Sequence, residues 1–219
     1  MSITTAEQFE ENEEYEKAYE EYKRLYARDS KNIDLLERLG HVATILDKKV
    51  DATEYYSKIL ELDPSSVMAY EQLMDVYVHT DRFKYYIARG NLHVVQQEIS
   101  HAINDFKKAL DKAQTEPEMN STRFVLASLY EQIGKNHQAI DEYLRILDTK
   151  NVNELVFLHL AQAYLNEDSL TSAIETLERA RESGYDTETV KEALAKLYLR
   201  NSQPDKARVL SQDKLVQVK

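Results

Sequence analysis

Apolar residues recur at helical spacing along most of the chain, in pairs of segments that short polar turns separate. Residues 123–147 show the pattern most clearly, with two amphipathic segments on either side of a turn at residues 133–135. Ala127 and Tyr130 mark the first segment, and Ala139 marks the second. Apolar positions three and four residues apart lie on one face of a helix, so the pattern predicts a helix, a tight turn and a second helix.

The same combination of small and large residues returns at a fixed interval. Alanines of the second segments mark it, and they are Ala18, Ala52, Ala102, Ala139, Ala173 and Ala207. The steps between them are 34, 50, 37, 34 and 34 residues. A constant period with residues in phase predicts stacked helical repeats, in which each unit buries its apolar face against its neighbours.

The step of 50 residues indicates one surplus helix. Residues 67–79 and 83–95 both have the pattern of a first helix, and only Thr80, Asp81 and Arg82 separate them. Asp81 is suited to capping the second of these helices. We therefore expect two arrays, residues 1–80 and residues 82–219, with helix 67–79 closing the first array as a capping helix.

Residues 33–64 resemble the tetratricopeptide repeat, a helix-turn-helix unit of 34 residues. The matching positions are Leu36, Leu39, Gly40, Ala52, Tyr56 and Pro64. Ala43 and Ile59 depart from the usual Tyr and Ala of that family. The resemblance extends over nearly the whole chain, in about six units. It implies an all-α, right-handed superhelical solenoid of helical pairs.

The resemblance also implies a scaffold or adaptor that binds proteins, since first helices of this family line a concave groove. The candidate partner-binding residues are Ile87, Asn91, Val94, Phe124, Glu131, Gln132, Leu155, Leu158, Gln162 and Leu165. Their apolar character favours an apolar helix or an extended peptide as partner. One alternative is a homo-oligomer that uses the same groove, or a groove filled by the chain's own segment Val209–Val218. Another is a regulatory module that senses a small ligand.

One subgroup of the family holds the C-terminal carboxylate of a chaperone with five groove residues. Only Asn91 matches that set, and the other four positions carry Ile87, Val125, Leu155 and His159. The sequence therefore gives no support to a carboxylate clamp. Glu131 would instead favour a basic residue in the ligand, and Gln132 and Gln162 would fix its register by hydrogen bonds.

The sequence predicts no enzyme, metal site or cofactor. The four glycines are isolated, so no phosphate-binding loop is present. None of the six histidines forms an i, i+4 pair, and His93 takes a packing position expected to be half-buried. There is no Cys, and the formal net charge of −11 argues against nucleic acid as a partner. No apolar run reaches membrane-spanning length, so we expect a cytoplasmic protein without membrane contact.

Overall fold

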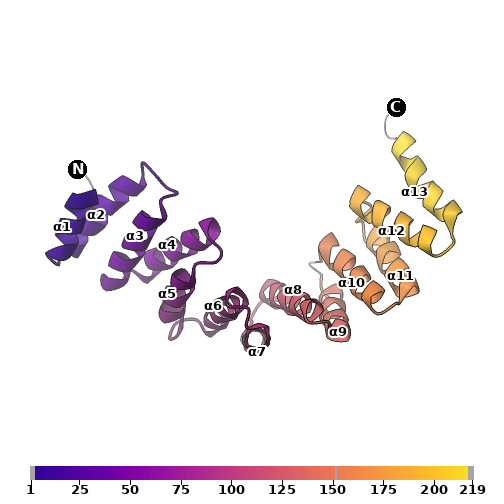
Figure 1. Cartoon of the computed structure of the whole chain (residues 1–219), viewed down its shortest axis with the longest axis horizontal. Helices are drawn as coiled ribbons and strands as arrows, with labels where there is room; N and C mark the ends of the chain where they lie inside the picture. Colours follow the sequence, from indigo (N-terminus) through magenta and orange to yellow (C-terminus); the bar gives the residue numbers. More distant parts are fainter. Residues whose placement is uncertain (1–2, 151, 217–219) are drawn as a thin grey trace. The chain divides into compact units, whose positions relative to one another are not determined.

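The computed structural model describes residues 3–150 and 152–216, with side chains described up to residue 210. All thirteen elements within these ranges are α-helices (Figure 1). Their chain order is α1 (Ile3–Glu11), α2 (Tyr15–Tyr26), α3 (Ile33–Ile45), α4 (Lys49–Leu62), α5 (Val67–Tyr77), α6 (Arg82–Val95), α7 (Ile99–Leu110), α8 (Glu116–Gln132), α9 (Asn136–Leu147), α10 (Glu154–Asn166), α11 (Leu170–Glu182), α12 (Glu188–Arg200) and α13 (Pro204–Val216). None of the described helices combines the length and the apolar character that crossing a lipid bilayer requires.

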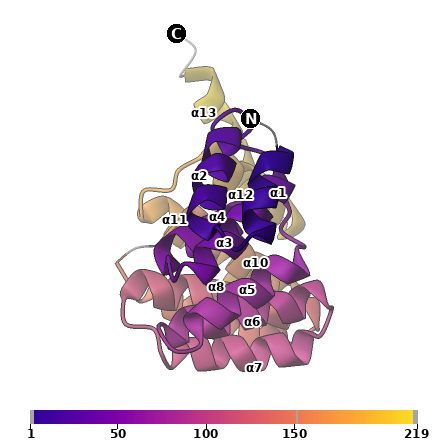
Figure 2. The same ribbon diagram turned by 90° about the vertical axis from the view of Figure 1, so that its left-hand side faces the viewer.

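The helices form two compact units, Met1–Lys112 and Ala113–Lys219. Within each unit, consecutive helices pack against one another, as the repeat pattern predicts. In the first unit, α6 and α7 lie side by side in both views (Figure 1 and Figure 2). In the second unit the pairs are α8 with α9, α10 with α11 and α12 with α13. Each unit is thus an all-α solenoid of helix-turn-helix repeats.

The boundary between the units differs from the one expected from the sequence. The pattern placed it at residue 81, whereas the structure divides the chain after Lys112. The reason is the core: Ala88 and Leu92 of α6 belong to the same buried cluster as Leu73 of α5. The surplus helix α5 therefore packs against α4 on one side and α6 on the other.

Two glycines allow close approach between the helices of a pair. A Cβ atom added to Gly40 would lie 2.6 Å from the Tyr56 ring, and one added to Gly90 would lie 3.1 Å from the Phe106 ring. Both aromatic rings are buried. A glycine inside a helix costs stability relative to alanine. Here each glycine leaves room for the aromatic ring of the paired helix, which explains its position.

Local signals set the helix ends. The side chain of Asp81 accepts a hydrogen bond from the Lys84 backbone N–H at 3.0 Å, which confirms the capping role expected for it. Thr115 and Glu118 form a capping box at the start of α8. Gly134 takes a left-handed φ of 69° between α8 and α9, a conformation that favours glycine. These signals fix where α6 and α8 begin and how α8 turns into α9.

Candidate functional site

The ten candidate partner-binding residues fall into both units. Ile87, Asn91 and Val94 lie on α6 in the first unit, where all three are half-buried. The other seven lie on α8 and α10 in the second unit, and we call them the α8–α10 face: Phe124, Glu131, Gln132, Leu155, Leu158, Gln162 and Leu165. The members of this second group belong to one compact unit, so they can form a single site.

Helix α10 contributes a row of leucines to this face. Leu155, Leu158 and Leu165 follow one another at three and seven residues, a spacing that places them on one side of the helix. The side chain of Leu155 is 51% exposed, whereas Leu158 and Leu165 are half-buried. The opposite side of α10 supplies Phe157 and Leu160 to the core. Helix α10 therefore has apolar residues on its solvent side in addition to those that it buries in the core.

An open hollow of about 420 Å³ lies between the first half of α8, the end of α9 and the start of α10. Its apolar walls are Pro117, Phe124, Val125, Ile146 and Val156. Asn120, Ser121 and Asn153 add polar groups to the lining. Leu155 does not line the hollow, but it lies in the first turn of α10 between the lining residues Asn153 and Val156 and is exposed.

Asn120 is a buried polar residue of this hollow. Its side-chain Nδ2 donates a hydrogen bond to Thr149 Oγ1 at 2.8 Å. Its Oδ1 is buried and has no hydrogen-bond partner among the described residues. Buried amide oxygens are usually satisfied, so this one is an acceptor for which the described part of the fold supplies no donor.

Side chains from α8, α9 and α10 meet beside the leucine row. The ring of Phe124 lies 5.7 Å from that of Tyr143 and 5.2 Å from that of His159. The Tyr143 hydroxyl donates a hydrogen bond to Glu131 Oε2 at 2.8 Å, and the same oxygen lies 3.5 Å from His159 Nδ1. Glu131 is thus engaged by two neighbours, which weakens the expectation that it selects a basic residue in the ligand.

The Tyr143 hydroxyl is held in its neutral form. Burial of the side chain raises its pKa, and the hydrogen bond to Glu131 adds to this effect, while Ser128 acts in the opposite direction. The net pKa is well above the usual value for tyrosine. Tyr143 therefore remains a donor to Glu131 over the ordinary pH range and ties α9 to α8.

The two glutamines expected to fix register are both exposed. Gln162 donates a hydrogen bond to Asn166 Oδ1 at 2.9 Å, within its own helix. The alternative covering segment, Val209–Val218, begins with an exposed Val209 and a buried Leu210. Its side chains beyond Leu210, including those of Leu215 and Val216, lie outside the described residues.

Three members of the site were not predicted from the sequence, and they are His159, Tyr143 and Asn120. His159 follows Leu155 by four residues, so helical spacing alone could have added it to the face. Tyr143 belongs to a second helix, and its contact with Glu131 depends on the crossing of α8 and α9. Asn120 resembles any polar residue near the start of a helix, and only the fold shows its burial.

Comparisons with known proteins agree with this architecture. Residues 87–153 match the family model described as Tetratricopeptide repeat. No curated protein matches the sequence. The C-terminal part of a TPR repeat-containing protein from Cytophaga hutchinsonii is 16% identical, with 99% of this chain and 79% of that chain covered and a TM-score of 0.55. MamA from AMB-1 is 20% identical, with 76% of this chain and 92% of that chain covered and a TM-score of 0.52.

These two structures resemble the chain in fold, at identities too low to carry over a function. The family model covers parts of both units, from α6 to the residues before α10. The 34-residue period, the helical pairs and the match of residues 87–153 to the family model agree, and the chain has the fold of tetratricopeptide-repeat proteins.

Proposed function

We propose that this protein is an interaction scaffold whose α8–α10 face binds an apolar segment of a partner protein. Tetratricopeptide-repeat proteins are generally non-catalytic scaffolds that present extended binding surfaces. The observation that carries the proposal is the hollow walled by Phe124, Val125 and Val156, together with the exposed Leu155 in the first turn of the same helix α10. An exposed apolar surface of this kind marks an interaction site more often than a free surface.

The partner segment is an amphipathic helix or an extended peptide with apolar anchors. A helix would lay residues spaced at three and four positions along Leu155, Leu158 and Leu165. An extended peptide would in addition bring backbone N–H groups toward the polar lining formed by Asn153 and Ser121. Exposed Gln132 and Gln162 supply a polar rim, as is usual around an apolar interface centre.

The three α6 residues are not needed for this proposal. Ile87, Asn91 and Val94 belong to the first unit, and the α8–α10 face is complete within the second. The homo-oligomer alternative uses the same apolar surface, so the same substitution tests it. Both functions predict that a charge at Leu155 removes an association, but they differ in whether the associated molecule is a second copy of the chain.

Leu155→Asp is expected to weaken partner capture about tenfold or more, because a carboxylate would be desolvated at the centre of an apolar contact. Leu155 is half exposed in the free protein, so the variant should fold normally. The measurement is a pull-down from native lysate, quantified against protein concentration, with circular dichroism to verify folding.

The matched control is Leu199→Asp, since Leu199 is 61% exposed on α12 of the same unit. It should capture the same proteins as the parent. Equal capture by Leu155→Asp and the parent would contradict the proposal. Light scattering that shows a dimer of the parent and a monomer of Leu155→Asp would assign the surface to self-association instead.

A further inference from the structure

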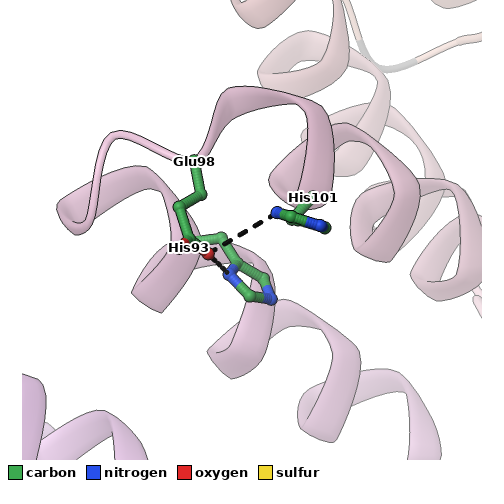
Figure 3. A group of neighbouring side chains, drawn as sticks. All are labelled: His93, Glu98 and His101. Atoms are coloured by element: carbon green, nitrogen blue, oxygen red, sulfur yellow. Dashed lines mark hydrogen bonds and ion pairs between the residues drawn. The ribbon is translucent and has the colours of Figure 1, made fainter.

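Three metal-ligating side chains gather where α6 passes into α7. His93 stands in the last turn of α6, Glu98 precedes α7, and His101 lies in its first turn. Figure 3 shows Glu98 extending toward both imidazole rings. Glu98 Oε2 lies 2.7 Å from His93 Nδ1 and 3.6 Å from His101 Nδ1. One ligand atom from each residue lies within 4.8 Å of the other two.

The backbone holds these ligands in place. Gln97 takes a left-handed φ of 61°, and the Glu98 N–H donates to the His93 carbonyl at 2.8 Å. This tight turn brings the end of α6 beside the start of α7. Glu98 and His101 are three residues apart, a Glu-x-x-His spacing that projects both side chains from one side of a helix.

The buried carboxylate of Asp105 orients the His93 ring through the ring nitrogen that does not face Glu98. Asp105 Oδ2 lies 3.4 Å from His93 Nε2, and the Asp105 side chain is almost fully buried. Arg89 binds Asp105 through two hydrogen bonds of 2.6 Å, which keeps the carboxyl charged. A carboxylate at Nε2 favours the tautomer with a proton there, so Nδ1 is left to face Glu98.

The spacing of the donors fits a small divalent cation. A tetrahedral ion with ligands about 2.0–2.2 Å away separates its donor atoms by roughly 3.4 Å. The observed separations of 2.7 and 3.6 Å lie on either side of that value. Glu98 and His101 are exposed enough to adjust, while His93 is fixed by Asp105.

The donor types select the metal. Two imidazole nitrogens and one carboxylate suit Zn²⁺, or Co²⁺ and Ni²⁺, whereas Ca²⁺ and Mg²⁺ require oxygen ligands. We infer that His93, Glu98 and His101 form a transition-metal site of the zinc type, with Asp105 as the residue that positions His93. The bound ion ties the last turn of α6 to the first turn of α7, and solvent completes its coordination.

The test uses the full chain without an affinity tag, stripped of metal by a chelator. Zn²⁺ is titrated by calorimetry, and Co²⁺ is titrated by visible absorption, which reports the ligand geometry directly. We expect one equivalent of each ion per chain and no heat with Ca²⁺ or Mg²⁺. His101→Ala and Glu98→Gln should each weaken Zn²⁺ binding by at least about 10- to 100-fold, as even outer-shell changes do.

The matched control is His137→Ala. His137 is also an exposed histidine, and it pairs with one carboxylate, that of Glu167, at 3.2 Å. This variant should bind Zn²⁺ like the parent, and His93→Gln should lose binding if it folds by circular dichroism. Absence of Zn²⁺ binding by the parent would overturn the inference. So would binding that survives His101→Ala and Glu98→Gln, or binding that His137→Ala reduces equally.

Discussion

Replacing Arg89 with methionine should lower the free energy of unfolding of the first unit by about 3–5 kcal/mol. Asp105 is 2% exposed and receives two hydrogen bonds of 2.6 Å from the Arg89 guanidinium. Removing the guanidinium leaves a buried carboxylate whose remaining neighbours are the Lys108 ammonium at 3.6 Å and His93 Nε2 at 3.4 Å. These partners compensate in part, so the loss should lie near the lower end of the range.

Arg89 also contributes packing through its neighbours. Its guanidinium lies 5.1 Å from the Tyr85 ring and 5.3 Å from the Tyr86 ring, and it donates a hydrogen bond to the Tyr85 hydroxyl at 3.0 Å. Methionine retains an apolar side chain against both rings, so the substitution keeps most of the packing while it removes the charge and its hydrogen bonds. The measurement is urea denaturation of the full chain, followed by far-ultraviolet circular dichroism.

Acidification should reduce the effect of Arg89→Met. Burial raises the pKa of Asp105, but the hydrogen bonds and charge of Arg89 outweigh it and hold the pKa below its usual value. A lowered pKa in the folded state gives stability that is present above the unfolded value of about 3.9 and is lost as pH falls through the folded value. The difference between parent and variant should therefore narrow below about pH 4.

The control is Arg38→Met, because Arg38 pairs with Glu7 at 3.0 Å and with Glu10 at 3.4 Å in the same unit, and its side chain is 43% exposed. Its loss should stay below about 1 kcal/mol. The double variant Arg89→Met with Asp105→Leu should regain most of the lost stability, since it leaves no buried charge. If Arg89→Met lowered the free energy of unfolding no more than Arg38→Met does, the buried Arg89–Asp105 pair would contribute no more to stability than an exposed pair.

Replacing Tyr143 with alanine should cost the second unit about 3–5 kcal/mol. Tyr143 is fully buried, and its ring contacts those of Phe124 and His159 at centroid distances of 5.7 and 5.9 Å. Alanine would leave a cavity under the α8–α10 face and would remove one of the two partners of Glu131. Partner capture should fall together with stability, because Phe124 would lose the ring that supports it.

Tyr143→Phe separates the ring from its hydroxyl. This variant retains the packing and removes only the 2.8 Å hydrogen bond to Glu131, for a cost of about 1.5–3 kcal/mol at most. His159 still faces Glu131 at 3.5 Å, which should limit the loss. Urea denaturation compares the two variants. Equal losses for Tyr143→Ala and Tyr143→Phe would mean that packing of the ring contributes little.

Much of the fold was predictable because the residues that pack a helical repeat recur at a fixed interval in the sequence. Gly40 and Tyr56 stand at fixed positions of one unit, and the structure confirms the close approach that a mid-helix glycine suggested. Ala139 and Ala173 are fully buried, as their recurrence indicated. The division after Lys112 was not recoverable in this way, because the core that joins α5 to α6 depends on contacts between repeats.

The chemistry of the surfaces was harder to predict. Apolar positions such as Leu155 could be assigned to a face from helical spacing alone. Pairs such as Glu131 with His159 depend on the distance between helices that no spacing rule gives. The sequence did not predict the cluster of His93, Glu98 and His101. Its ligands come from two helices that meet through a turn at Gln97, so they do not show the i, i+4 spacing of a histidine pair on one helix.

Site-specific photo-crosslinking shows directly whether the α8–α10 face contacts a partner protein. A photoreactive phenylalanine analogue replaces Leu155 in one variant and Leu199 in another, since both side chains are exposed in the same unit. Mass spectrometry then identifies the crosslinked peptide. We expect crosslinks from position 155 to an apolar segment of another protein and none from position 199. Crosslinks from position 199 alone, or from position 155 only to a second copy of this chain, would contradict it.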